Sequence, residues 1–419
     1  MKKLSVAVVS KADKSGGGAS RVADDLCDVL LNDGHQVDHW LGMYDEEKPF
    51  LKMLHSDSMP IKTGIKVLNR LVKYAGFPDL LPFEYMIMKY KNQLDKYDIV
   101  HFHDLSSMIS PLTVSMIAKV KPTVWTFHDC SPFTAGCLYP FECNQYKSIC
   151  KDCPQADAWP INSSLLSAEK LYKMKKHIHS KNQIHCITPS RWMSEKANSS
   201  GLFKEIPQVC PNGVDLTKFK PFTKPEKKSF RKAFDLPLDR KIVLLTAADV
   251  QDDRKGMKYS LEALRKLKEA RPFLLIVGKM NYKTELALKG FDYFCTGYIF
   301  KDEMKARIFA ASDVFLFCSL ADNLPLVVLE TMACAVPTVG FATGGIPEMV
   351  EQKETGFLTP MKDQKALEKA LTLALKNDTA RKWGAKARKK VVEKYSMENF
   401  LQNHLQLYSK ILGLNSESE

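Results

Sequence analysis

Short apolar runs alternate with segments of helical periodicity along most of this chain. After the first run, apolar residues stand at i, i+4, i+7 and i+8 (Val22, Leu26, Val29 and Leu30), a spacing typical of one buried helix face. Buried strands that alternate with amphipathic helices predict parallel α/β sheets. The predicted strands are Leu4–Ser10, Asp98–His103, Thr123–His128, Ile184–Pro189, Lys241–Ala247, Phe273–Gly278, Tyr293–Gly297, Val314–Ser319 and Pro337–Ala342.

These strands fall into two sets. Between them lie Val209–Asp215 and a polar run, rich in proline and lysine, that continues to Lys228. A chain of 419 residues is too long for one hydrophobic core, so two domains are expected. We predict a first domain over residues 1–212, a second over 213–385, and a helical, lysine-rich segment over 386–419.

Composition narrows the class of protein. The chain is 45% hydrophobic and 26% charged, which is ordinary for a soluble globular protein. No apolar run approaches the ~18 residues of a membrane-spanning helix, and the first apolar run lacks the cleavage site of a signal peptide, so a cytoplasmic protein is expected. The net charge of +13 favours acidic partners such as diphosphates or anionic lipids. No zinc-finger or RNA-binding pattern supports nucleic acid.

Two carboxylates bracket an apolar helix after the predicted strand Val314–Ser319. Asp322 falls in the loop at the carboxyl end of that strand, where open parallel sheets bind ligands. Pro325 begins the predicted helix, whose free N–H groups would face an anion. Glu330 stands about two turns further, where a carboxylate could accept the two hydroxyls of a ribose. An ordinary capping Asp with one solvated Glu is the alternative.

Other polar groups follow predicted strands in the same way. The glycine-rich run Ser15–Arg21 opens a helix and lets a ligand approach the backbone, although its spacing is not that of a dinucleotide fingerprint. Arg254 and Lys255 follow the strand over 241–247, so two cations stand close to the carboxyl end of a predicted strand. His128 ends a strand, a better position for a site residue than a helix face. His101 and His103 are weaker candidates.

This combination of motifs resembles the family-four retaining glycosyltransferases, whose usual acid pair is Glu, seven residues, Glu. Asp322 departs from that pattern, and Asp249 stands where the family usually has Arg, so that Arg254 is the candidate substitute. The resemblance covers nearly the whole chain and is densest from about residue 240 to 360. It implies the GT-B fold, in which two Rossmann-like doubly wound domains face a central cleft and the last helix returns to the first domain.

The resemblance also implies roles for individual residues. Glu330 would bind the ribose, Gly297 and Tyr298 would hold the base, and the turn at Gly344 would face the cleft. The implied catalytic residues are His128, Asp322, Arg254 and Lys255, and the implied donor-binding residues are Gly17, Gly18, Gly297, Tyr298, Asn323, Leu324, Leu326 and Glu330. The implied reaction transfers a sugar with retention, by a front-face mechanism without a catalytic metal.

Five of the eleven cysteines crowd into residues 130–153. Four thiolates at short separations can form a closed zinc site, and a reducing cytoplasm argues against disulfides. This stretch also resembles a bacterial exopolysaccharide subset of the family, of colanic-acid type, which carries a comparable loop. The expected ligands of a structural zinc ion are Cys137, Cys143, Cys150 and Cys153, with Cys130 left over; a loop of unligated thiols is the alternative.

A basic amphipathic segment lies earlier in the first domain. Lys62, Lys66, Arg70 and Lys73 recur at helical spacing beside apolar residues, a pattern typical of helices that lie on an anionic membrane. Such a helix would bring the protein to a lipid-linked acceptor at the inner face of the membrane. A core helix with solvated lysines is the alternative.

Three functions are compatible with these observations. The expected one is transfer from a nucleotide sugar, a UDP-sugar ahead of a GDP-sugar, to a saccharide acceptor in surface polysaccharide synthesis. A nucleotide-sugar epimerase can share the architecture but would need no acceptor. A non-catalytic binding or partner subunit remains open because Asp322 replaces the usual Glu.

Overall fold

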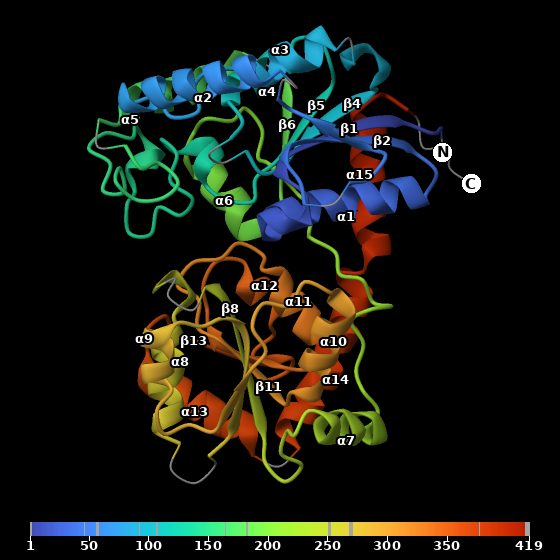
Figure 1. The fold of residues 1–419 in the computed structure, drawn as a ribbon, viewed down its shortest axis with the longest axis vertical. Coiled ribbons are helices and arrows are strands. Elements are labelled where there is room, and N and C mark those ends of the chain that lie inside the picture. Colours follow the sequence, from blue (N-terminus) through green and yellow to red (C-terminus); the bar gives the residue numbers. More distant parts are fainter. Residues whose placement is uncertain are drawn as a thin grey trace. The chain divides into compact units, whose positions relative to one another are not determined.

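The computed structural model describes residues 2–45, 47–55, 58–91, 93–105, 108–163, 165–181, 183–249, 253–267, 271–376 and 378–414, with backbone only for 247–249. The chain divides into two compact units (Figure 1). The first comprises Met1–Pro211 and Leu401–Glu419, and the second comprises Asn212–Phe400. The predicted domain boundary after residue 212 lies one residue from the point where the chain passes from the first unit to the second, between Pro211 and Asn212.

The first unit contains a parallel sheet of seven strands in the order β3-β2-β1-β4-β5-β6-β7. The order reverses next to β1, which is the arrangement of a doubly wound Rossmann-like sheet. Its strands are β1 (Ser5–Ala12), β2 (Gln36–Met43), β3 (Leu51–Met53), β4 (Ile99–Phe102), β5 (Thr123–Thr126), β6 (Ile184–Thr188) and β7 (Gln208–Val209).

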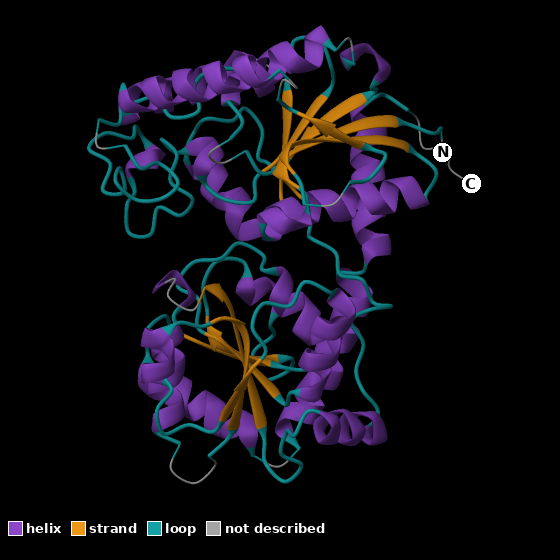
Figure 2. Cartoon of the chain, viewed as in Figure 1, coloured by secondary structure: helices purple, strands orange, loops and turns teal. Residues whose placement is uncertain are grey.

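Helices lie on both sides of this sheet (Figure 2). They are α1 (Gly18–Asn32), α2 (Met59–Tyr74), α3 (Phe83–Tyr90), α4 (Pro111–Ile117), α5 (Ala168–Lys181), α6 (Arg191–Ser199) and, from Leu401, the later part of α15 (Met397–Ile411). The helix α15 is tied to the sheet by a hydrogen bond of 2.7 Å between the Tyr408 hydroxyl and His101 Nδ1 on β4.

The second unit repeats the architecture with six parallel strands in the order β10-β9-β8-β11-β12-β13. Both faces of the sheet are covered, because neighbouring residues of β8 enter different apolar clusters: Val243 and Leu245 one, Ile242 and Leu244 the other. Continuous apolar strands are therefore required here. The strands are β8 (Ile242–Asp249), β9 (Phe273–Lys279), β10 (Tyr293–Cys295), β11 (Val314–Phe317), β12 (Thr338–Phe341) and β13 (Gly356–Thr359).

The helices of the second unit lie in two layers around its sheet (Figures 1 and 2). The helices α8 and α13 contribute to one apolar cluster, and α10 and α11 contribute to the other. The helices are α7 (Lys224–Ala233), α8 (Met257–Arg265), α9 (Tyr282–Ala287), α10 (Asp302–Ala311), α11 (Leu326–Ala333), α12 (Ile346–Met349), α13 (Gln364–Leu375) and α14 (Thr379–Lys394).

All nine predicted strands are present, and the predicted fold class is confirmed. Four further strands were missed, namely β2, β3, β7 and β13. The strand β2 carries Asp38 and His39 among its apolar residues, and β3 and β7 are only three and two residues long. None of these presents the uninterrupted apolar run that marks a central strand.

Candidate functional site

The loop between β11 and α11 gathers charged side chains around Asp322. Lys255 Nζ donates a hydrogen bond of 2.8 Å to Asp322 Oδ2, and the Ser319 hydroxyl donates another of 2.9 Å to the same oxygen. Arg254 Nη1 lies 3.9 Å from that oxygen and donates to the carbonyl of Ala321 at 3.0 Å. The structure therefore brings three of the predicted site residues together at the carboxyl ends of β8 and β11.

These contacts fix the charge of Asp322. Burial alone would raise its pKa, but the cations of Lys255 and Arg254 and the hydrogen bonds from Lys255 and Ser319 hold the pKa of Asp322 below its usual value. Asp322 is thus a carboxylate at neutral pH, and its side chain is only 13% exposed. Ser319 was not predicted; its position just after an apolar strand was the available signal.

Glycines allow this loop to pack closely. A Cβ on Gly344, which has φ +58°, would stand 1.6 Å from the carbonyl oxygen of Asp322. A Cβ on Gly256 would stand 2.0 Å from the carbonyl oxygen of Cys318, and one on Gly340 would stand 1.9 Å from that of Phe317. Since real Cβ atoms do not approach backbone oxygens this closely, the positions require glycine.

The backbone after Asp322 is held by hydrogen bonds from two other segments of the chain. Asn323 and Leu324 are buried. Leu326 begins α11 with Pro325 as its N-cap, so the helix starts one residue later than predicted. The Asn323 carbonyl accepts from Gly345 N–H at 2.8 Å. The Leu324 carbonyl accepts from the side chain of Asn212 at 3.0 Å. Asn212 was interpreted only as part of a linker, yet it supports the loop.

Glu330 lies on the first turns of α11 and is almost fully buried, with 3% of its side chain exposed. Its Oε1 accepts a hydrogen bond of 2.9 Å from Lys305 Nζ on α10. The sequence predicted Glu330 but not this cation. An i, i+3 relation between Asp302 and Lys305 would have suggested a local surface pair instead.

The predicted base-binding turn follows β10. Gly297 adopts φ +69°, and its carbonyl accepts from Gly278 N–H at 3.0 Å. Tyr298 is 41% exposed and its ring meets that of Phe300 edge-on, with the centroids 4.7 Å apart. An exposed aromatic pair at the carboxyl edge of the sheet offers a surface on which a planar base can stack.

In the first unit, the glycine-rich run forms the turn between β1 and α1. Gly17, with φ +103°, is the N-cap of α1, and Gly18 is its first residue. The turn is held by the buried Asp13, whose Oδ1 accepts from the Ser15 N–H at 3.0 Å and from its hydroxyl at 2.6 Å. Nothing lies within 4 Å of a Cβ built on Gly17 or Gly18, so the backbone there is open to a ligand.

His128 belongs to a group of histidines in the first unit. Its Nε2 lies 3.0 Å from His103 Nδ1, and the His101 ring centroid lies 4.3 Å from that of His103. Burial lowers the pKa of His128 to about 4; the Asp104 carboxylate opposes this shift and His404 adds to it. The imidazole is therefore neutral at physiological pH and able to exchange hydrogen bonds with a hydroxyl.

The cysteine loop does not form a metal-binding group. Burial raises the pKa of Cys137 to about 12 and of Cys150 to about 11, and neighbouring thiols add to each shift. Over the described residues, no three His, Cys, Asp or Glu side chains are arranged to hold a metal ion. Cys137, Cys143, Cys150 and Cys153 thus share one region, but as placed here they are not grouped as ligands around one point. Structural zinc stays a prediction, which metal analysis of the purified protein would decide.

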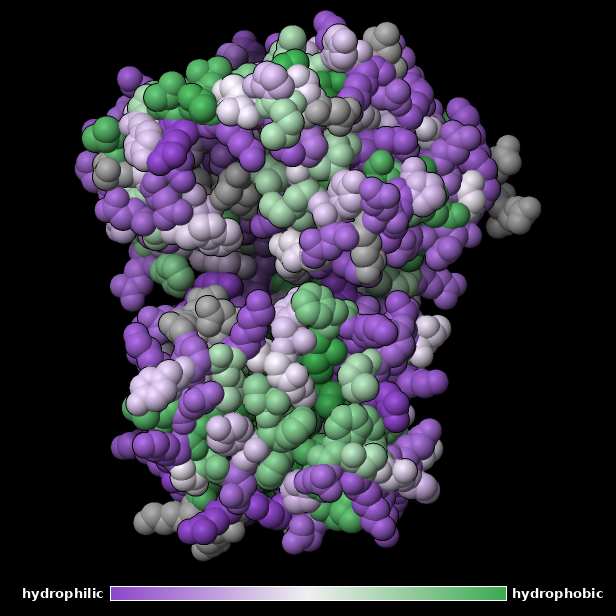
Figure 3. Space-filling view, in the orientation of Figure 1, coloured by the Kyte–Doolittle hydropathy of each residue, from purple (hydrophilic) through white to green (hydrophobic). Residues whose placement is uncertain are grey.

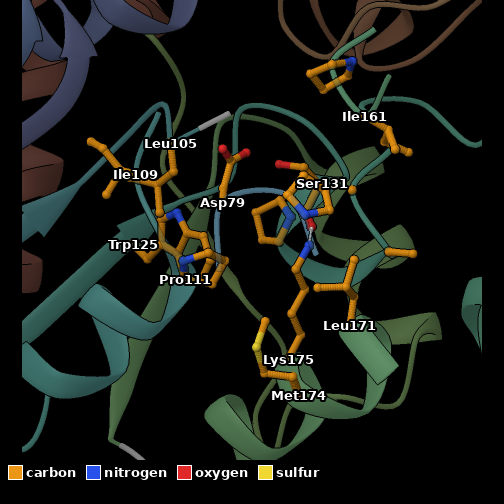
Figure 4. A pocket seen from close by; sticks show the side chains of 15 residues that line it. Asp79, Leu105, Ile109, Pro111, Trp125, Ser131, Ile161, Leu171, Met174 and Lys175 are labelled. Atoms are coloured by element: carbon orange, nitrogen blue, oxygen red, sulfur yellow. Dashed lines mark hydrogen bonds between the residues drawn. The ribbon is translucent and has the colours of Figure 1, made fainter. Parts of the chain in front are cut away.

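A small cavity lies between α5 and the loops after β4 and β5 (Figure 4). It encloses about 60 Å³ and is walled by apolar side chains, among them Trp125, Ile109 and Leu171. Lys175 reaches its rim, where Nζ donates to the Ser131 carbonyl at 2.6 Å. This volume is too small for a sugar ring or a nucleotide, so we do not assign the cavity to a substrate.

Comparison with known proteins places the chain in a family. Residues 16–218 match the model described as Glycosyltransferase Family 4, and residues 226–390 match the model of Glycosyl transferases group 1. Together the two matches run through both units. The chain belongs to the family-four type of GT-B glycosyltransferases.

Individual relatives match parts of the chain or all of it. It is 32% identical over 116 residues to the N-acetyl-alpha-D-glucosaminyl L-malate synthase of Bacillus anthracis, which covers 27% of this chain and 30% of that protein. It is 30% identical over 193 residues to an Escherichia coli protein provisionally named a colanic acid biosynthesis glycosyltransferase, covering 43% and 44%. An uncharacterized glycosyltransferase of Methanocaldococcus jannaschii is 22% identical over 94% of both chains. The match thus covers less than two thirds of the first two relatives.

Solved structures share the fold over the whole chain. The sucrose-phosphate synthase of Thermosynechococcus elongatus aligns with a TM-score of 0.71 at 19% identity, over 99% of this chain and 100% of that one. HepE of Anabaena, solved in complex with UDP and glucose, aligns with a TM-score of 0.70 at 15% identity, over 97% and 99%. At these identities the likeness shows the GT-B fold alone.

Proposed function

We propose that this protein transfers a sugar from a nucleotide-sugar donor to a saccharide acceptor. The observation that carries the proposal is the cluster of Lys255, Arg254 and Asp322, which sets two cations and an ionised carboxylate at the carboxyl edge of the second sheet. A diphosphate needs cations of this kind, and a sugar needs acceptors for its hydroxyls. Membership of the glycosyltransferase family supports the same chemistry.

The donor that we propose is a UDP-sugar, with a GDP-sugar second. Support comes from HepE, a protein of the same fold that was solved with UDP. Lys255 and Arg254 would neutralise the diphosphate as the glycosidic bond breaks, which is where negative charge grows. We propose that these fixed cations serve in place of a catalytic metal ion.

We further propose that the anomeric configuration is retained. In a front-face step, the bond from the anomeric carbon to the diphosphate oxygen breaks while the acceptor oxygen bonds to that carbon on the same face. The acceptor proton passes to the departing diphosphate, which gives a glycoside and free UDP. Asp322, held ionised by two cations, would accept hydrogen bonds from the sugar, and neutral His128 is the residue of the first unit that we assign to the reaction.

We propose a lipid-linked acceptor because of α2. The structure buries no residue of this helix, and several of its apolar side chains are exposed to solvent: Ile61 is 55% exposed, Val67 54% and Leu71 59%. Figure 3 shows a patch of hydrophobic residues over α2. Lys62, Lys66, Arg70 and Lys73 share the helix, and each cation near an anionic bilayer is worth about 1 kcal/mol. The alternative of an ordinary core helix is not favoured by this exposure.

We propose that the protein binds the inner face of the cytoplasmic membrane. There it would take part in the synthesis of a surface polysaccharide. Within the described residues, no helix is long and apolar enough to cross a bilayer. Sedimentation with vesicles of phosphatidylglycerol and phosphatidylcholine tests the contact. We expect Leu68→Glu with Leu71→Glu to abolish binding and Val120→Glu, on an equally exposed valine outside α2, to leave it intact. Equal binding by all three proteins would refute the membrane role of α2.

The donor site is tested by calorimetric titration with UDP and GDP, beside Glu330→Ala. We expect one nucleotide to bind and the variant to weaken that binding. If the wild-type protein binds neither, the proposed function is wrong, and turnover of a donor alone into a second nucleotide sugar would support an epimerase instead.

A further inference from the structure

The partner of Glu330 lies on a different helix and was not part of the predicted site. Lys305 projects from α10, and its Nζ stands 2.9 Å from Glu330 Oε1 on α11. The lysine side chain is 16% exposed and the glutamate side chain 3%, so the pair lies mostly out of solvent. The two helices pack directly here, because the Cys334 thiol lies 3.6 Å from the Ala306 carbonyl.

Several contacts hold Lys305 in place. Its ammonium lies 3.5 Å from Asp302 Oδ1, one turn earlier on α10. It also stands over the ring of the buried Phe219, 5.3 Å from the centroid, at a distance typical of cation–π contact. The position of the ammonium is therefore set by a carboxylate, an aromatic face and Glu330 together.

A buried carboxylate without an opposite charge is strongly destabilised, and a long glutamate side chain has several rotamers available. The contact with Lys305 reduces both the cost of burying the charge of Glu330 and the freedom of its side chain. It supplies the opposite charge and fixes the orientation of the carboxylate, because one oxygen is taken by the ammonium. A carboxylate has about four acceptor positions on its two oxygens, so one carboxylate can hold a lysine and accept hydrogen bonds from ligand hydroxyls at the same time.

We propose that Lys305 is a positioning residue for Glu330 and that, through it, Lys305 sets the preference of the donor site for a ribonucleotide over a deoxyribonucleotide. This inference rests on the proposed function, in which Glu330 binds the ribose. Lys305 itself does not touch the donor. It holds the carboxylate where the 2′ and 3′ hydroxyls can donate to it.

The test is calorimetric titration of the full-length protein with UDP and with 2′-deoxy-UDP. A hydrogen bond to a charged group supports a preference of about tenfold or more for UDP in the wild-type protein. Lys305→Met keeps an unbranched apolar stem and removes the charge, and we expect the preference to fall to about twofold or less. Lys305→Arg should restore most of it. Lys301→Met makes the same substitution at the exposed lysine that is the N-cap of α10, and this matched control should keep the preference.

The outcomes separate two kinds of failure. If the wild-type protein binds neither nucleotide, the proposed function and this inference both fall. If it binds UDP and 2′-deoxy-UDP equally, Glu330 is not at the ribose and the positioning role is wrong. If Lys305→Met weakens both nucleotides by the same factor and keeps their ratio, Lys305 only joins α10 to α11, and the inference is overturned. If Lys305→Met does not fold, Lys305→Gln gives the same comparison with a neutral donor.

Discussion

The two units of this protein control charge in opposite ways. All ten histidines of the chain lie in the first unit, and those around His128 are buried beside one another. The candidate site of the second unit contains no histidine and is built from lysine, arginine and carboxylates in contact, as in the pairs of Lys255 with Asp322 and of Lys305 with Glu330.

The difference shows how burial affects the charge of an ionisable side chain when oppositely charged groups outweigh it and when they do not. Burial of a histidine disfavours its charged form, and the rings of this cluster are therefore neutral at pH 7. Burial of Asp322 would disfavour its charge in the same way, but two adjacent cations reverse the effect. The same fold thus offers a neutral polar site in one unit and a charged one in the other.

Removal of a cation from the second unit should have the largest effect. We expect Lys255→Ala to lower the rate of sugar transfer by about a thousandfold, because it removes charge stabilisation at the leaving diphosphate and leaves Asp322 with a weaker partner. Steady-state kinetics with a nucleotide sugar measures this. Lys258→Ala, on an exposed lysine three residues later, is the control. If both variants lost the same fraction of the transfer rate, Lys255 would have no specific role at the diphosphate.

Mild acid should lower the free energy of unfolding of the first unit more than that of the second. His128 and His179 each have a pKa of about 4 in the folded state against 6.5 unfolded, so the unfolded state binds more protons between these values. The stability of the first unit should fall by about 3 kcal/mol per histidine as pH drops from 6.5 to 4. The carboxylate of Asp322, whose pKa is lowered, loses its contribution only when pH falls through the range below about 4.

Tryptophan fluorescence distinguishes the units in this experiment. Four of the five tryptophans lie in the first unit, so Trp383→Phe leaves a signal from that unit alone. We expect the urea midpoint of this signal to fall between pH 6.5 and 4.5, while circular dichroism retains a second transition that moves little. A common shift of both transitions would contradict the comparison.

A smaller effect is expected at the turn that supports Asp322. Gly344→Ala should destabilise the second unit by about 2 kcal/mol or more, because it adds both left-handed strain and a clash with the Asp322 carbonyl. Gly290→Ala has φ +87° but no atom within 4 Å of its new Cβ, so it should cost only about 1 kcal/mol. Urea unfolding measures both, and equal costs would show that the clash relaxes freely.

The smallest effect concerns an uncharged part of the donor site. Tyr298→Ala should weaken UDP binding by about three- to tenfold, which corresponds to the loss of stacking on an exposed ring. Tyr282→Ala removes a more exposed tyrosine outside this turn and should leave the affinity unchanged. Calorimetric titration with UDP measures the affinity of both variants. An unaltered affinity in Tyr298→Ala would place the base elsewhere.

The sequence predicted what depends on local pattern. Both sheets, their nine apolar strands and the loop carrying Asp322 follow from buried runs and the residues next to them. Lys305 could not be found this way, because its partner Glu330 lies 25 positions away on another helix. Asn212 and Ser319 also act through distant or polar contacts that leave no periodic signal. The zinc hypothesis rests on cysteine spacing, which does not fix where thiols point, so structural zinc stays a prediction.

The chain leaves the first unit after Pro211 and re-enters it at Leu401, so the first unit is complete only when both ends of the chain are present. The β-bridge of Val214 with Ser396 brings the two ends of the second unit together, and that unit is continuous in sequence. During translation the second unit can therefore finish folding while the first still lacks the helix that brings Tyr408 to His101. The domain that is made first would be the last to mature.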